Sequence, residues 1–381
     1  MKPQCLLRFI ACLVALLALA GCASAWEVSI TGGPADIVLD REALRALEGF
    51  AVEVEGGEAV PLEQVFYEHG FQVIDEIVVE SEDGQKRAYD WGAVMDDAYW
   101  QNDGSLLIAG KTVRPAAIHV EQNPAVTEIE ASITDIAPTA AAALGLPPPS
   151  SATGQPIIET SASHVMLVYL DGFGYVRYTE ALEADLIPNL AQLDPPLRGI
   201  TTYPSITSVS SASVLTGAPP SVHGADRRGI RKTETETILD VAAAAGLEVA
   251  AVEGESLPFA LRSAEITLSG DRDGNGSTDD NVLANTLAVL EEGMPHLLYV
   301  HFHGIDDAGH RYGPRTPEDE AAIRFVDDAV GQILAATPPD TLVIIFADHG
   351  MHAVNEDGRL GNHGHLVERD MYIPIFVIEP R

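Results

Sequence analysis

Short runs of apolar residues alternate with longer amphipathic stretches along the chain from about residue 160 onwards. The runs are rich in Val, Ile and Leu, which predicts strands buried on both faces, and the stretches between them have the periodicity of helices. This alternation is typical of an α/β fold, in which helices cover both faces of a mostly parallel sheet. The predicted strands are residues 165–170, 247–252, 297–302, 342–346 and 372–378, and the predicted helices lie near 237–245, 281–292 and 317–335.

The preceding part of the chain has a different pattern. Between residue 26 and about residue 125, shorter apolar runs such as 77–79 alternate with glycines and acidic turns, which predicts a small β-rich or α+β domain. The stretch 147–154 is rich in Pro and Ser, as linkers are. We therefore expect an accessory domain over residues 22–125 and a larger α/β domain over residues 126–381.

The first 21 residues have the features of a secretory signal. Lys2 and Arg8 precede an apolar stretch over residues 9–20, which as a helix would be about 18 Å long and too short to span a bilayer. The end of the stretch, Leu19-Ala20-Gly21-Cys22, resembles the lipobox of bacterial lipoproteins, in which Cys22 would carry the lipid. The alternative is ordinary cleavage after residues 23–25. Both predict an exported protein, and the first predicts membrane attachment only through an N-terminal lipid.

Composition and charge narrow the classes of function. The chain is 46% hydrophobic and 21% charged, as globular proteins are, and its 22 basic and 57 acidic residues give a net charge of −35. A surface this negative repels phosphate backbones, so nucleic-acid binding is not expected to be the main role.

Three of the predicted strands are followed within four residues by an acidic residue. Asp171 follows the first strand, Asp306 follows the third and Asp348 follows the fourth. A single carboxylate after a strand is commonly a helix cap or a turn former. Since the carboxyl ends of parallel strands meet at one sheet edge, three together would repel each other unless a cation neutralised them.

Histidines accompany these carboxylates. His310 follows Asp306 by four residues, His349 is adjacent to Asp348, and His363 precedes the last predicted strand. A donor set of Asp and His without sulfur suits zinc ahead of manganese or iron. There are more donors than one four-coordinate ion needs, so the sequence predicts two ions close together, as in two-metal phosphoryl-transfer sites.

A nucleophile is also present in the sequence. Residues 203–217 are rich in hydroxyl groups, and residues 208–215 are predicted to form a short helix that Gly217 ends. A hydroxyl in the first turn of that helix would lie at the positive end of its dipole, where anionic phosphate groups also bind. The alternative is ordinary capping of the helix by Ser or Thr.

Five motifs occur in a fixed order: Asp171-Gly172; Pro204-x-x-Thr207 with Thr216-Gly217 and Pro220-x-x-His223-Gly224; Asp306-x-x-x-His310 with Tyr312-Gly313-Pro314; Asp348-His349-Gly350-Met351; and His363-Gly364 before Pro374-Ile375-Phe376. The motifs resemble those of the alkaline phosphatase superfamily, closest to its type I phosphodiesterase/nucleotide pyrophosphatase branch. The stretch 301–306 is also similar to a motif of the ethanolamine phosphate transferases in that superfamily. The resemblance implies an alkaline phosphatase-like core and a hydrolase that cleaves phosphodiester or pyrophosphate bonds in small phosphate esters.

The resemblance also implies roles for individual residues. Thr207 would be the nucleophile and would form a phospho-threonine intermediate that water hydrolyses. One zinc would be held by Asp171, Thr207, Asp348 and His349, and the other by Asp306, His310 and His363.

This sequence departs from the diesterase pattern three residues after the nucleophile, where Ser210 replaces the usual Asn that donates to a phosphoryl oxygen. A phosphomonoesterase or a phosphoethanolamine-type transferase on the same site is therefore an alternative. Arg227 and Arg228 are either substrate-binding or solvated surface arginines. An alternative of another class is a non-catalytic envelope binding protein.

Residues 132–157 resemble the segment that closes many members of the superfamily after their last metal-binding histidine. Here the segment precedes the first motif, which predicts a circularly permuted domain with residues 126–158 as the displaced C-terminal segment. The alternative is an unrelated Ala-rich helix.

Residues 271–280 have the spacing of oxygen ligands found in calcium loops, with Asp271, Asp273, Asn275 and Asp279 in register and Val282 where Glu is usual. This segment is either a Ca²⁺ site or an acidic surface turn.

Overall fold

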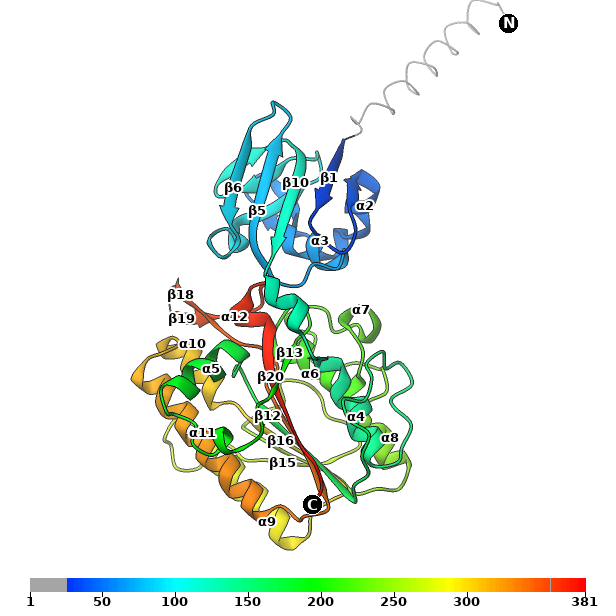
Figure 1. The fold of residues 1–381 in the computed structure, drawn as a ribbon, viewed down its shortest axis with the longest axis vertical. Coiled ribbons are helices and arrows are strands. Elements are labelled where there is room, and N and C mark those ends of the chain that lie inside the picture. The colour runs from blue at the N-terminus through cyan, green and yellow to red at the C-terminus, as the bar shows by residue number, and fades with distance from the viewer. Residues whose placement is uncertain (1–25, 357) are drawn as a thin grey trace, which may run out of the picture. The chain divides into compact units, whose positions relative to one another are not determined.

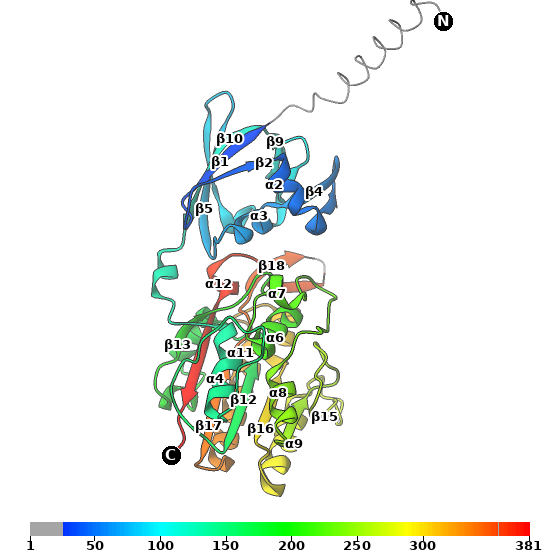
Figure 2. The same ribbon diagram turned by 90° about the vertical axis from the view of Figure 1, so that its right-hand side faces the viewer.

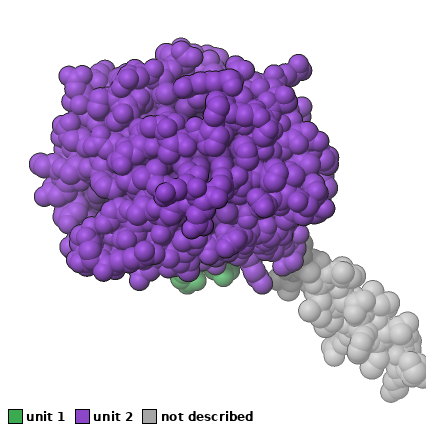
Figure 3. All heavy atoms as spheres, turned by 90° about the horizontal axis from the view of Figure 1, so that it is seen from below, with its two compact units in different colours: residues 1–123 green, residues 124–381 purple. Residues whose placement is uncertain are grey.

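The structure is a computed structural model that describes residues 26–356 and 358–381 (Figure 1 and Figure 2). The chain divides into two compact units between Asn123 and Pro124, which Figure 3 shows in two colours. The predicted signal and Cys22 lie outside the described residues. Among the described helices, none has both the length and the apolar content needed to cross a membrane.

The N-terminal unit contains two five-stranded sheets. The first has the order β2-β1-β10-β5-β6, with β1 (Glu27–Thr31), β2 (Ile37–Asp40), β5 (Ile74–Ser81), β6 (Lys86–Asp90) and β10 (Pro115–Gln122). The second has the order β3-β4-β7-β8-β9, with β3 (Val52–Val54), β4 (Gly57–Pro61), β7 (Ala98–Gln101), β8 (Leu106–Ile108) and β9 (Lys111–Val113). The helices are α2 (Arg41–Ala46), α3 (Leu62–Glu68), η1 (Glu48–Phe50), η2 (Trp91–Ala93) and η3 (Met95–Asp97).

Large aromatic side chains form the core of this small unit. Phe66, Phe71, Trp91 and Trp100 are all fully buried, and the Phe66 ring meets the edge of Trp91 with 5.5 Å between ring centroids. Aromatic rings bury more area than aliphatic side chains, which helps a unit of this size to fold on its own core. The prediction of a small N-terminal β-rich domain is confirmed.

The second unit is built on an eight-stranded sheet with the order β11-β13-β20-β17-β12-β16-β14-β15. Only β20 is antiparallel to its neighbours, and the other strands all run in one direction. The central strands β12, β16 and β17 are buried on both faces, as their apolar sequences predict. The strands are β11 (Ala131–Ser132), β12 (His164–Leu170), β13 (Leu197–Ile200), β14 (Val249–Glu253), β15 (Glu265–Leu268), β16 (Leu297–Phe302), β17 (Thr341–Phe346) and β20 (Tyr372–Ile378), with a separate pair β18 (His352–Glu356) and β19 (Arg359–Asn362).

Helices cover both faces of this sheet. The helices α4, α6 and α8 pack together on one face, and α9, α10 and α11 pack on the other (Figure 1). The prediction of an α/β fold with a mostly parallel, covered sheet is confirmed. The helices are α4 (Ile136–Ala143), α5 (Tyr175–Glu183), α6 (Thr207–Thr216), α7 (Pro220–His223), α8 (Ile238–Ala244), α9 (Asp279–Glu292), α10 (Gly304–Tyr312), α11 (Pro317–Ala336) and α12 (Glu368–Met371), with the short helices η4 (Pro124–Glu128), η5 (Ile133–Asp135) and η6 (Leu190–Gln192).

The segment before β12 belongs to this second unit. Its strand β11 pairs parallel with β13 at the sheet edge, and α4 packs against α6 and α8. The backbone N–H groups of Thr153 and Gly154 both donate to the carbonyl of Gly217, at the end of α6. The segment is therefore a packed part of the α/β unit, and its origin by circular permutation stays a prediction.

The sheet register brings several polar side chains to one edge. Leu170 at the end of β12 pairs with Phe302 of β16, and Tyr169 pairs with Phe346 of β17, so these three strands end at the same level. The residues that follow these strands therefore share one edge of the sheet, where parallel α/β folds bind their ligands.

Candidate metal centre

Asp306, His310 and His363 form one compact group of donors, which we call the helix cluster. Asp306 lies in the first turn of α10 and His310 lies one turn later on the same face, which brings His310 Nε2 to 3.3 Å from Asp306 Oδ2. His363 follows β19 and places its Nε2 atom 3.6 Å from Asp306 Oδ1 and 3.1 Å from His310 Nε2.

Backbone carbonyls fix the orientation of both imidazoles in the helix cluster. His310 Nδ1 donates to the carbonyl of Gly361 and His363 Nδ1 donates to that of Ser205, each at 2.8 Å. In the neutral rings the two Nε2 atoms are then acceptors, and they face each other and a carboxylate. Asp306 Oδ1 is buried and has no hydrogen-bond partner among the described residues. This arrangement of acceptors fits a divalent cation.

Asp171, Asp348 and His349 form a second group, which we call the strand cluster. Asp171 directly follows β12, and Asp348 and His349 lie just beyond the end of β17. His349 Nδ1 donates to the Gly350 carbonyl at 2.9 Å, and its Nε2 atom lies 3.1 Å from Asp348 Oδ2 and 3.5 Å from Asp171 Oδ1. The ring therefore turns an acceptor toward two carboxylates, as in the helix cluster.

The strand cluster is closed to water. Asp348 and His349 are fully buried and Asp171 is nearly so, and Asp348 Oδ2 lacks a hydrogen-bond partner among the described residues. Burial and then the neighbouring Asp171 raise the pKa of Asp348 to about 7. Two carboxylates this close in a buried site repel each other when both are ionised, and a cation removes that repulsion.

The two clusters adjoin each other. The rings of His349 and His363 stack with their centroids 3.7 Å apart, and donor atoms of Asp171, Asp306 and His349 lie within 4.8 Å of one another. Burial and then His349 lower the pKa of His363 to about 3, so this ring is a neutral donor at physiological pH. This arrangement of donors is compatible with two cations side by side, and the binding of two ions by these residues stays a prediction.

Thr207 is the first residue of α6 and lies beside the strand cluster. Its hydroxyl oxygen is 3.3 Å from His349 Nε2 and 3.5 Å from Asp171 Oδ1. The preceding residue Ile206 has an extended backbone, and Gly217 ends the helix with a left-handed φ of 67°. Thr207 is only partly buried, so a substrate can reach its hydroxyl at the positive end of the helix dipole.

The residues predicted to bind substrate lie in different surroundings. Ser210 is fully buried one turn into α6, and its hydroxyl pairs with that of Thr201 at 3.2 Å. Arg227 is exposed and donates to the adjacent Asp226 at 2.8 Å. Arg228 is also exposed, and partial burial of its guanidinium and the nearby Arg359 lower its pKa while Asp306 of the helix cluster raises it. Substrate binding by these three residues stays a prediction.

The predicted calcium loop is split by the structure. Asp271 accepts from the backbone N–H groups of Gly274 and Gly276 within an exposed turn. Asp279 is instead buried at the start of α9, where its two carboxylate oxygens accept from the N–H groups of His303 and Gly304 at 3.0 and 2.9 Å. The Asp279 carboxylate therefore binds backbone N–H groups in the segment that follows β16, and calcium binding by the loop stays a prediction.

The sequence reasoning did not assign a third group of donors, which consists of His301, His303 and Asp171. The signal for this group in the sequence was the pair His301 and His303, which lie two residues apart at the end of a predicted buried strand. Glu253, the last residue of β14, contacts both of these histidines.

The sheet and its donor set together define an α/β protein able to hold divalent cations at the carboxyl edge of its strands. A sequence model of the type I phosphodiesterase/nucleotide pyrophosphatase family matches residues 165–376, and the chain belongs to this family. The match spans every motif on which the predicted resemblance depended, and that resemblance is confirmed.

Individual relatives match shorter or more distant stretches. The catalytic subunit of mouse GPI ethanolamine phosphate transferase 3 is 29% identical over 104 residues, which are 27% of this chain and 9% of that protein. Ectonucleotide pyrophosphatase/phosphodiesterase family member 7 of Rattus norvegicus is 25% identical over 240 residues, 55% of this chain and 54% of that protein. Among solved structures, phosphonoacetate hydrolase from Sinorhizobium meliloti aligns over 51% of this chain and 58% of its own, with 20% identity and a TM-score of 0.41.

Proposed function

We propose that the protein is an exported, two-zinc phosphohydrolase that cleaves phosphodiester or pyrophosphate bonds of small molecules through Thr207. The observation that carries the proposal is the position of the Thr207 hydroxyl, at a helix N-terminus and 3.3 to 3.5 Å from donors of the strand cluster. The family to which the chain belongs supports the same reaction class.

In this proposal the strand cluster and Thr207 hold one zinc ion and the helix cluster holds the other. The two ions would neutralise the phosphoryl oxygens and activate the attacking and leaving oxygens. The donor set fits zinc binding, since it consists of carboxylates and of imidazoles whose Nδ1 atoms are held by backbone carbonyls. Two of the carboxylate oxygens, Asp306 Oδ1 and Asp348 Oδ2, have no hydrogen-bond partner among the described residues.

The chain's own groups carry out the covalent steps. Thr207 Oγ1 forms a bond to phosphorus while the bond from phosphorus to the leaving oxygen breaks, and the hydroxyl proton leaves with that oxygen. Water then attacks the phospho-threonine, which restores the Thr207 hydroxyl and releases the phosphate product. The N-terminus of α6 stabilises the negative phosphoryl group during both steps, and Arg228 supplies positive charge near the helix cluster.

A second candidate is phosphoryl transfer to an acceptor other than water. Sequence similarity to the GPI ethanolamine phosphate transferases favours it, because the matching segment is 29% identical over 104 residues. Ser210 stands where the diesterase branch usually has Asn, so the preference for diesters over monoesters also stays a prediction.

Hydrolysis of bis-p-nitrophenyl phosphate and p-nitrophenyl phosphate by the zinc-loaded protein tests the proposal. We expect faster turnover of the diester, loss of at least about 10³-fold in kcat for Thr207→Ala, and loss of activity on chelation that zinc restores. Ser208→Ala is the matched control, since it removes the adjacent partly buried hydroxyl. Equal rates for Thr207→Ala and wild type would contradict Thr207 as the nucleophile, and no hydrolysis of either ester by the zinc-loaded wild type would favour a non-catalytic binding protein.

Export and lipid attachment are part of the proposal and rest on the sequence of residues 1–25. Labelling of cells with radioactive palmitate, for the wild type and Cys22→Ala, measures both. We expect label in the membrane fraction only for the wild type, and cytoplasmic retention of both proteins would contradict export.

A further inference from the structure

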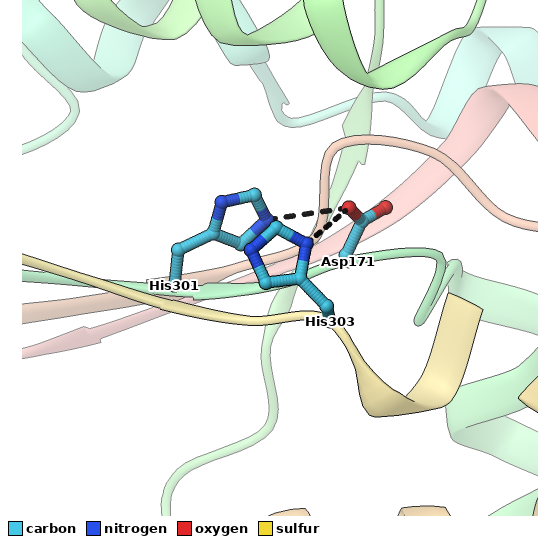
Figure 4. Close-up of side chains that lie close together, drawn as sticks. All are labelled: Asp171, His301 and His303. Carbon is cyan, nitrogen blue, oxygen red and sulfur yellow. Dashed lines mark ion pairs between the residues drawn. The ribbon is translucent and has the colours of Figure 1, made fainter. Parts of the chain in front are cut away.

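We propose a third divalent-cation site, formed by His301 Nε2, His303 Nδ1 and Asp171 Oδ2, in which the Glu253 carboxylate holds both imidazoles in place. This site lies beyond the two-zinc centre of the proposed function and shares one residue with it, Asp171. Figure 4 shows that both imidazoles turn a ring nitrogen toward the same oxygen of Asp171.

The local structure brings the two histidines together. His301 is the fifth residue of β16 and His303 follows the end of that strand, and residues two apart along a strand project to the same side. Their ring centroids are 3.8 Å apart. Asp171 reaches them from the end of the neighbouring strand β12, whose Leu170 pairs with Phe302.

The distances suit a bound cation. Asp171 Oδ2 is 3.3 Å from His301 Nε2 and 3.6 Å from His303 Nδ1. Donors at about 2.0–2.1 Å from a tetrahedral zinc lie about 3.3–3.4 Å from one another, so the present spacing needs little adjustment. His301 is fully buried, and its Nε2 atom has no hydrogen-bond partner of good geometry among the described residues.

Glu253 acts on the opposite side of both rings. Its Oε1 atom is 3.1 Å from His301 Nδ1, and its Oε2 atom is 2.9 Å from His303 Nε2. When each ring donates one proton to Glu253, its other nitrogen is an acceptor that faces the Asp171 carboxylate. Carboxylates commonly orient metal-binding histidines in this way, and here one carboxylate serves two of them.

The rings of His301 and His303 are tilted by 35° to each other, and His301 is closed to water. A cation between the two rings and Asp171 would give both ring nitrogens and the carboxylate one common partner. The His303 side chain is 19% exposed, so water can reach the site and complete the coordination.

Such a cation would also orient Asp171. The Oδ1 atom of this residue faces Thr207 and His349, and its Oδ2 atom faces the two histidines. Asp279 supports the arrangement from the backbone side, since it accepts from the N–H groups of His303 and Gly304.

Counting bound cations tests the site. The full chain is stripped with chelator, reloaded with Zn²⁺ or Co²⁺, passed through gel filtration and analysed by mass spectrometry of the metal. We expect three cations per chain for the wild type and two for His303→Gln and for His301→Gln, with the corresponding loss of visible Co²⁺ absorption. The double variant His164→Gln/His296→Gln is the matched control, because it removes another histidine pair, with ring centroids 5.9 Å apart, outside the proposed site.

The outcomes separate the two proposals. Two cations in the wild type and in both variants, with intact diester hydrolysis, would overturn the third site and leave the proposed function standing. Three cations in wild type and variants alike would place the extra ion elsewhere and also overturn it. Fewer than two cations in the wild type would instead contradict the two-zinc centre. Thermal unfolding curves identify any variant that fails to fold, and His303→Gln, at the more exposed position, is the milder of the two changes.

Discussion

His223 is expected to make the stability of the second unit depend on pH. This histidine of the Pro-x-x-His-Gly motif is buried at the end of α7, where the Ala225 N–H donates to its Nδ1 atom at 3.1 Å. Its Nε2 atom therefore carries the proton and donates to the Ser213 hydroxyl of α6 at 2.9 Å. Burial lowers the pKa of His223 to about 4, against the opposing effect of Asp226. The neutral ring joins α6 to α7.

The sign and size of the effect follow from these pKa values. Below the ordinary histidine pKa of 6.5 the unfolded chain binds a proton that the folded chain rejects until about pH 4. Stability contributed by the neutral ring is thus complete above pH 6.5 and falls as the pH falls from 6.5 toward 4. With these two values, lowering the pH from 7 to 5 removes about 2 kcal/mol from the free energy of unfolding.

Urea unfolding of wild type and His223→Gln at pH 7 and pH 5, both in the presence of chelator, measures this effect. Far-UV circular dichroism follows both units, while tryptophan fluorescence follows the N-terminal unit alone, because Trp26, Trp91 and Trp100 all precede Pro124. We expect the gap in stability between the two proteins to shrink by about 2 kcal/mol at pH 5. Parallel pH dependence of wild type and variant would refute the reasoning.

Three further predictions concern packing and metal loading. The buried Arg177 donates to the carbonyls of Gly172 and Ile305 and to the carboxylate of Asp319. Arg177→Met should lower the free energy of unfolding in urea by about 3–5 kcal/mol, because the buried Asp319 loses its ion-pair partner. An unchanged urea midpoint would contradict this. Removal of metal should lower the melting temperature of the second unit, because a free metal concentration of 100 times the Kd stabilises the folded state by about 2.7 kcal/mol. Calorimetry with and without chelator measures this, and equal melting temperatures would show that the clusters bind no metal. Trp100→Ala should destabilise the N-terminal unit by about 3–5 kcal/mol with the zinc content unchanged, whereas loss of zinc would show that the two cores are not independent.

The sequence predicts the centre of the sheet better than its edges. The central strands β12, β16 and β17 are continuous apolar runs, because both of their faces are covered, and their predicted bounds agree with the structure to within one residue. The two edge strands β11 and β15, and β13 next to β11, were not predicted. They are two to four residues long, and β13 (Leu-Arg-Gly-Ile) carries a charged residue and a glycine, so no apolar run marks them.

The residues of the candidate site were also predictable only in part. Carboxylates that directly follow strong strands, such as Asp171, were predictable, since parallel strands deliver their ends to one edge. Glu253 is the last residue of β14, one position beyond the end of the predicted range 247–252, and it was missed. The partners of His301 could not be predicted from spacing alone, because they come from β12 and β14, whose order in the sheet is set by tertiary packing.

Anomalous diffraction at the zinc edge, from crystals grown with zinc, tests the two-metal account most directly. The account predicts one peak within bonding distance of the helix cluster and another within bonding distance of the strand cluster and the Thr207 hydroxyl, about 3.5–4 Å apart. It would be contradicted by a map in which neither cluster carries a peak, or in which the Thr207 hydroxyl faces bulk solvent away from both.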